Sequence, residues 1–162
     1  MQVRDWVDMV MREGMVCPEY MRKLAACSDN GEFFRVLADA NGGAWLFGLH
    51  ARGVELPVDA FCREFGRYLN GDWEVVYPQG YTSKMYCRHE GDMVADTTLV
   101  WLLECMDVDV EVPRNCYPTV VLSDGSRAEI AMGYGSRLNI ELYGDAEYSV
   151  SGDMSRVRVV RH

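Results

Sequence analysis

The sequence lacks the strongest signatures of metal binding, catalysis and membrane insertion. None of its six cysteines forms a Cys-x-x-Cys pair, which excludes the usual zinc and redox motifs. With only three histidines, few groups can serve acid–base chemistry near neutral pH. No apolar run approaches the roughly 20 residues of a membrane-spanning helix, and the first residues do not resemble a secretory signal. We therefore expect a cytoplasmic protein with reduced thiols, no membrane contact, and no cofactor or metal.

Basic residues are scarce where acidic ones gather. The net charge is −9. Residues 1–71 carry ten acids and eight bases, whereas residues 72–162 carry fifteen acids and eight bases. Between Glu90 and Glu111 there are seven acids and no base. Such a field repels phosphate backbones, so nucleic acid is disfavoured as a partner and a basic protein surface is favoured.

The first 71 residues have the apolar period of short α-helices. Their apolar side chains recur three or four positions apart in five segments: 5–11, 18–25, 29–40, 44–51 and 57–69. Pro18 suits a first helical position, and Ser28 or Asp29 can cap the third segment. Asn41-Gly42-Gly43 is expected to end that segment. Residues 1–71 are thus predicted to be a helical sub-domain.

After Gly71 the apolar period falls to two, which is typical of β-strands. Three strand-like segments come first: 73–77, 81–87 and 97–103. From Asp107 onward, apolar triplets alternate with polar residues, and Gly, Ser or Asp separates the units. The triplets are Val108-Val110-Val112, Ala128-Ile130-Met132, Leu138-Ile140-Leu142 and Ala146-Tyr148-Val150.

Two folds fit this repeat. An antiparallel meander or sandwich would reverse at each glycine cluster, whereas a β-solenoid would turn a corner and stack each strand on one from the previous coil. The short strands and the repeated inward triplets favour the solenoid. The prediction is an α+β fold in which helices over residues 1–71 pack against a solenoid-like sub-domain over residues 72–162.

Several stretches are similar to known sequences. The tail resembles bacterial and phage repeats of the form alanine-x-valine-x-alanine-x-glycine-x, as in SRAEIAMGYGSRLNIELYGDAEYSVSGD. Such tails form β-solenoids, as bactofilin-like domains do. With this tail, the whole chain resembles an uncharacterised family of small phage and prophage proteins from gut bacteria through GMVCPEYMRKLAAC, LADANGGAWL, NGDW and GYTSKMYC. The resemblance implies a solenoid and a phage origin, and it brings no activity.

The densest group of reactive side chains is Cys87, His89, Glu90 and Asp92. If they lie on one strand, Cys87 and His89 share a face and could bind a metal or act as nucleophile and base. A strand end entering a turn is the simpler interpretation, because the sequence offers no second ligand pair.

A second candidate is the acidic row Asp107, Asp109 and Glu111. On a strand these carboxylates face outward while the alternating valines face inward. The row is either a solvated face or a site that recognises Lys and Arg on a protein partner.

The leading hypothesis is a non-enzymatic, phage-related binding or assembly protein whose acidic β-surface meets a protein partner, in one form a host defence factor. A homo-oligomer is also expected, because solenoids leave open ends. Two alternatives stay open: a metal or Cys/His enzyme, and a protein that sequesters a nucleotide signal.

Overall fold

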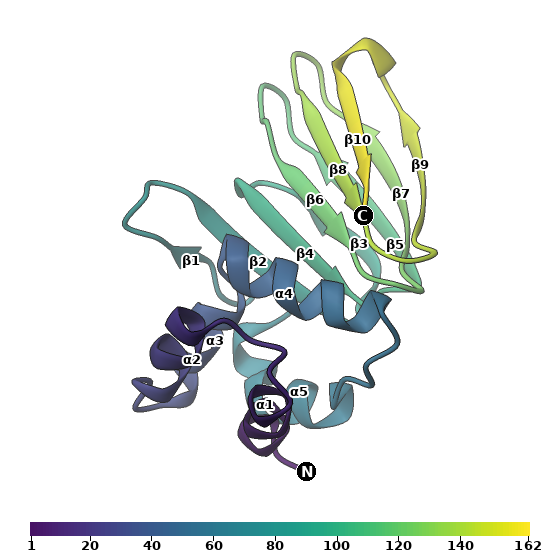
Figure 1. Cartoon of the computed structure of the whole chain (residues 1–162). Coiled ribbons are helices and arrows are strands. Elements are labelled where there is room, and N and C mark those ends of the chain that lie inside the picture. Colours follow the sequence, from purple (N-terminus) through teal and green to yellow (C-terminus); the bar gives the residue numbers. More distant parts are fainter.

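The computed structural model describes all 162 residues, as a group of helices followed by β-strands (Figure 1). The helices are α1 (Val3–Arg12), α2 (Pro18–Ala25), α3 (Asn30–Leu37), α4 (Ala40–Ala51) and α5 (Val58–Phe65). The strands are β1 (Val75–Val76), β2 (Thr82–Cys87), β3 (Glu90–Val94), β4 (Leu99–Leu103), β5 (Asp107–Val112), β6 (Thr119–Leu122), β7 (Arg127–Met132), β8 (Leu138–Leu142), β9 (Glu147–Ser151) and β10 (Val157–Arg161). The predicted α+β class is confirmed. None of the helices combines the length and apolar character needed to cross a membrane.

The β part is a solenoid of about four turns built from two parallel sheets. One sheet has the order β1-β2-β4-β6-β8-β10 and is called the helix-packed sheet; the other has the order β3-β5-β7-β9 and is called the free sheet. Only β1 pairs in the antiparallel sense. Val108 lies opposite Ala128 and Thr119 opposite Asn139, so a coil in the middle of the solenoid takes 20 residues. From β2 onward consecutive strands alternate between the sheets, which decides against the meander.

The inward triplets fill the solenoid interior as predicted. Val108, Val110, Ile130 and Ile140 are at most 2% exposed and belong to one cluster of 17 buried residues. Burial of such side chains contributes roughly 1.5–3 kcal/mol each. The polar breaks form the corners, where Gly125 has a φ of +77° that a glycine adopts without strain. The interior is therefore a packed apolar scaffold, in which Cys105 is buried and against which Cys116 packs.

The helices cover part of the outer face of the helix-packed sheet, chiefly over β2 and β4, with α4 lying across it (Figure 1). Trp101 on β4 packs edge-on against Phe47, with ring centroids 5.1 Å apart. Its indole Nε1 donates a hydrogen bond to the Ala38 carbonyl, 2.9 Å away. Val121 and Tyr143 belong to the same helical core. β4 is consequently buried on both faces, one in the solenoid and one under the helices.

One predicted helix end is wrong. Asp29 caps α3 as expected, but the helix ends at Leu37, and Asn41-Gly42-Gly43 lies inside α4. A Cβ on Gly43 would lie 2.3 Å from the Trp101 ring, and one on Gly42 would lie 2.1 Å from the Tyr20 hydroxyl. These glycines therefore serve close packing of α4 and do not end a helix.

A further strand was not predicted. β3 (Glu90–Val94) was expected to be a Glu-Gly-Asp turn, but it pairs in parallel with β5. Met93 is its only buried residue, because β3 sits at the edge of the free sheet. A strand with one inward apolar side chain has no alternation from which it could be recognised.

Candidate functional site

The outer face of the free sheet carries an excess of carboxylates and is here called the acidic face. Seven exposed acidic side chains occupy outward positions on its four strands: Glu90, Asp92, Asp107, Asp109, Glu111, Glu129 and Glu147. Arg127 is the single base among the outward residues of these strands. The alternation of β5 causes this arrangement, because it turns every valine inward and every acid outward.

The parallel register places like charges side by side. Asp92 lies opposite Asp109, and Asp109 lies opposite Glu129. Neighbouring strands are about 4.8 Å apart, so this row brings three carboxylates together across the sheet. Like charges directly opposite each other destabilise a sheet by roughly 0.2–1 kcal/mol per pair. None of the seven acids is within 4.0 Å of a basic side chain, so the repulsion is not relieved inside the chain.

A groove of about 850 Å³ runs over the same face. Four acids, Asp92, Asp109, Glu111 and Glu129, line it together with one base, Arg114. The acidic face is thus hollowed where its carboxylates are closest. A protruding cationic side chain from another molecule would meet several carboxylates at once.

The predicted row is placed as expected. Asp107, Asp109 and Glu111 are exposed on β5. Glu90 and Asp92, which were grouped with the cysteine and histidine before them, belong to this same face through the pairing of β3 with β5. Nowhere in the chain do three or more His, Cys, Asp or Glu side chains come close enough to hold a metal ion.

Cys87 and His89 do not share a strand face. β2 ends at Cys87, and Arg88 adopts a left-handed conformation with a φ of +51° that turns the chain into the next strand. The Cys87 sulfur lies 2.9 Å from the Cys62 sulfur on α5, among the buried residues under the helices. His89 instead packs its ring against Tyr86, with centroids 5.3 Å apart. The structure therefore does not bring the two together as nucleophile and base.

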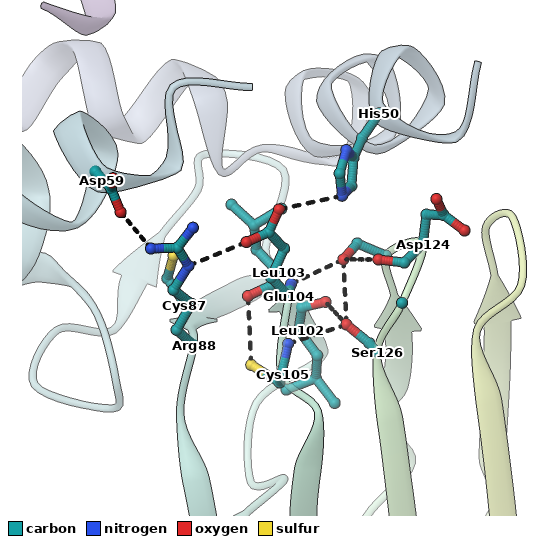
Figure 2. Close-up of polar contacts among 12 residues, drawn as sticks. His50, Asp59, Cys87, Arg88, Leu102, Leu103, Glu104, Cys105, Asp124 and Ser126 are labelled. Carbon is teal, nitrogen blue, oxygen red and sulfur yellow. Dashed lines mark hydrogen bonds and ion pairs between the residues drawn. The ribbon is translucent and has the colours of Figure 1, made fainter. Parts of the chain in front are cut away.

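A polar network that the sequence did not reveal joins the helices to the solenoid corners (Figure 2). Glu104 lies at its centre: one carboxylate oxygen is 3.5 Å from His50 Nε2 on α4, and the other accepts a hydrogen bond of 3.0 Å from Arg88 Nε. Arg88 also pairs with Asp59 on α5. Two helices and two corners are held together by this chain of contacts. Both Glu104 oxygens are engaged, which suits positioning better than proton transfer.

Buried serines fix the adjoining corner (Figure 2). Ser126 Oγ donates to the Leu102 carbonyl at 3.1 Å and accepts from the Cys105 amide at 3.1 Å. Ser123 Oγ accepts from the Glu104 amide at 2.8 Å. These hydroxyls satisfy backbone groups that a tight corner would otherwise leave without partners. They make the corner rigid and so orient Glu104.

The sequence missed Glu129 and Glu147 as members of the acidic face. They are 20 and 38 positions after Asp109, and only the coil length places Glu129 opposite Asp109 and Glu147 on the same face opposite Arg127. Comparisons of the chain with known protein families, with curated proteins and with solved structures found no match. The geometry of the acidic face is therefore the basis for a functional proposal.

Proposed function

We propose that this chain is a non-enzymatic binding or assembly protein whose acidic face binds a basic protein surface. The observation that carries the proposal is the row Asp92, Asp109 and Glu129, in which neighbouring strands hold three carboxylates without a base. Lys or Arg side chains from a partner would replace repulsion by attraction. The interaction would steer association and favour basic partners over others.

The scaffold beneath the acidic face favours recognition by a preformed surface. The free sheet rests on the packed interior triplets, so its outward side chains are anchored on regular strands. A rigid face loses little conformational freedom on binding, which leaves more of the contact energy for affinity. The groove along the row adds a hollow for the cationic groups.

A charge-reversal experiment tests the proposal. The probe is a synthetic peptide of about ten residues with Lys at every second position, titrated calorimetrically at low ionic strength. In the double variant Asp109→Lys/Glu129→Lys we expect affinity to fall by about tenfold or more, since close charge pairs couple by roughly 1.5 kcal/mol or more. Affinity of the unchanged protein should also fall as salt is added.

The matched control is Asp8→Lys/Glu13→Lys, which changes net charge equally at exposed positions on and just after α1. We expect its affinity to stay within about threefold of the unchanged protein, because the altered charges lie away from the acidic face. Equal losses in the two double variants would show that net charge alone drives binding. That result would overturn the proposal.

A phage origin, which the sequence resemblance implies, remains part of the proposal. It would make a basic host factor, such as a nucleic-acid-binding defence protein, the partner of the acidic face. The test is co-purification from a bacterial host lysate with the triple variant Asp107→Lys, Asp109→Lys and Glu111→Lys as the comparison. A basic protein that is retained by the unchanged chain and lost from the variant supports this form; partners that do not change contradict it.

Self-association remains a separate prediction, since β9 and β10 are edge strands with unpaired backbone groups. Sedimentation at micromolar concentration tests it, and a mass of one chain would contradict it.

A further inference from the structure

A second charged surface lies on the opposite side of the solenoid. Arg137, Arg156 and Arg158 line a hollow of about 760 Å³ on the helix-packed sheet, together with Tyr117 and Asn139. The helices do not cover this hollow, because their contacts stop at Val121 and Tyr143. In a chain of net charge −9, three guanidinium groups therefore meet in one concavity.

These arginines form no close ion pair in the chain, since none of the three is within 4.0 Å of a carboxylate. The Nε of Arg156 is buried and has no acceptor at all. A buried donor without a partner destabilises the folded chain, and more strongly when the group is charged. Asp153 is the acid at this corner, and its carboxylate accepts hydrogen bonds from the Ser155 hydroxyl and amide at 2.6 and 3.0 Å.

The strand register explains why the arginines converge. Arg158 on β10 lies opposite Asn139 on β8. The first residues of the two strands, Leu138 and Val157, are also partners, and each follows directly after an arginine, Arg137 or Arg156. Two positively charged side chains therefore precede neighbouring strands at the same level. An oxyanion would satisfy the free guanidinium donors and relieve that repulsion, and Arg binds phosphate groups through planar paired donors.

We propose that Arg137, Arg156 and Arg158 bind the phosphate groups of a small phosphorylated ligand, with Tyr117 packing against its ring. Tyr117 is 61% exposed, and the Arg137 guanidinium lies 6.0 Å from its ring centroid. The hollow has the volume of a small-molecule site, which is typically about 300–1,000 Å³. A nucleotide has both parts that this arrangement recognises, an anionic group and an aromatic ring. The inference does not depend on the acidic face.

Two probes separate the parts of the site: inorganic pyrophosphate for the arginines, and adenosine triphosphate for arginines and tyrosine together. We expect saturable binding of both by calorimetry, weakened about tenfold or more by Arg156→Gln. Tyr117→Ala should weaken the nucleotide and leave pyrophosphate within about twofold. Arg127→Gln, which removes an exposed arginine from the free sheet, is the control and should change neither affinity beyond about twofold.

The folded state of each variant is checked by its unfolding midpoint. Absence of binding by both probes at millimolar concentration would overturn the proposal, as would equal affinity in Arg156→Gln. Binding of single-stranded RNA that needs Arg156, without any binding of pyrophosphate, would also overturn it and assign the surface to nucleic acid.

A different observation concerns the thiols of Cys62 and Cys87. Their sulfur atoms are 2.9 Å apart, one on α5 and the other at the end of β2. Cys62 is half-buried and Cys87 is buried. The hydrogen bond from Cys87 lowers the pKa of Cys62 to about 7, and the nearby Arg88 guanidinium also lowers it. The shared hydrogen bond and burial raise the pKa of Cys87.

We infer that Cys62 and Cys87 form a reversible disulfide that locks α5 to the solenoid. With a peroxide as oxidant, the Cys62 thiolate attacks one oxygen, the O–O bond breaks, and the departing hydroxide is protonated to water. Cys62 is then a sulfenic acid. The Cys87 sulfur attacks the Cys62 sulfur, the S–O bond breaks, and hydroxide leaves with the Cys87 proton as a second water. An external thiol reverses the change by disulfide exchange.

The disulfide would lie at the junction between α5 and the solenoid. Cys87 immediately precedes Arg88, and the Arg88 guanidinium pairs with Asp59 on α5 and with Glu104 (Figure 2). A bond between these cysteines, which are 25 positions apart, would restrain the same junction covalently. Closing a loop of that length stabilises the folded chain, and for this chain length we expect the unfolding midpoint to rise by on the order of 5–10 °C.

Peptide mapping after peroxide treatment tests the inference. We expect one linked peptide pair containing Cys62 and Cys87, a mass loss of two hydrogens, and the higher midpoint, all reversed by dithiothreitol. Cys17→Ser is the control, because Cys17 is exposed and should not alter the linkage. Cys87→Ser should stop at a sulfenic acid on Cys62, and alkylation of Cys62 in the unchanged protein should rise with a midpoint near pH 7. Both thiols remaining alkylatable after peroxide, or a linkage through other cysteines, would overturn it.

Discussion

The two sheets of the solenoid share one backbone pattern and differ in what covers them. β4 reads LVWLL and is buried at every position, because the solenoid interior lies on one side and the helices on the other. β5 reads DVDVEV and alternates between exposed and buried, because only the interior covers it. Burial on both faces erases the period of two, and burial on one face preserves it. The sequence of a strand therefore indicates whether other elements cover one or both of its faces.

The difference also separates stability from recognition. Residues on the outer face of β2 and β4 in the helix-packed sheet hold the helical half in place. Residues on the outer face of the free sheet carry charges that repel one another and contribute little to folding. Substitutions on the two outer faces should therefore change different properties of the protein.

The largest effect is expected from Trp101→Ala on the helix-packed sheet. The change leaves a cavity beside Phe47 and removes the hydrogen bond to the Ala38 carbonyl. Truncation of a buried tryptophan costs about 3–5 kcal/mol of unfolding free energy. Denaturant unfolding measures it. A loss below about 1 kcal/mol would mean that the helices do not rest on β4.

Gly43→Ala should come next and tests the contact between α4 and the same tryptophan. An added Cβ would lie 2.3 Å from the indole ring, so α4 must shift, at a cost of about 1–3 kcal/mol. Gly48→Ala is the matched control in the same helix, because its nearest neighbour would be 4.0 Å away. It should stabilise by roughly 0.5–1 kcal/mol through helix propensity. Changes of the same sign at both positions would contradict the packing.

Ile140→Val probes the interior that both sheets share. Ile140 is fully buried on β8, inside the solenoid and away from the groove. Loss of one methylene there costs about 0.5–1.5 kcal/mol. Thermal unfolding should show the lower midpoint with binding of the Lys peptide unchanged. A loss of peptide affinity without a loss of stability would refute the separation of the two functions.

The smallest effect is expected on the acidic face, and it has the opposite sign. Asp109→Asn removes a charge that faces Asp92 and Glu129, so it should stabilise by roughly 0.2–1 kcal/mol at low ionic strength. At about 1 M salt the gain should disappear, because charges at this spacing are then screened. Destabilisation at low salt would show that these carboxylates do not repel each other in the folded chain.

Much of the fold could be predicted because the spacing of apolar residues in helices and strands involves only residues close together in the sequence. The inward triplets, the Asp29 cap and the first helical position of Pro18 are properties of neighbouring residues, and the structure confirms them. The acidic row on β5 was predictable for the same reason.

The rest depends on contacts between distant residues. Gly42 and Gly43 resemble a helix end until Trp101, nearly 60 residues later, is placed against them. Asp92 joins Asp109 only through the pairing of β3, a strand that its own sequence does not indicate. Both the meeting of Cys62 with Cys87 and the convergence of the arginines likewise require the coil to be built first.

Carboxylate footprinting with glycine ethyl ester tests the central claim that the acidic face is the recognition surface. Labelling is quantified by peptide mass spectrometry, in the free protein and with the Lys peptide added. We expect Asp109 and Glu129 to be labelled in the free protein and protected by the peptide, while labelling of Asp8 and Glu13 does not change. Protection that is equal at all four positions, or confined to α1, would contradict the claim.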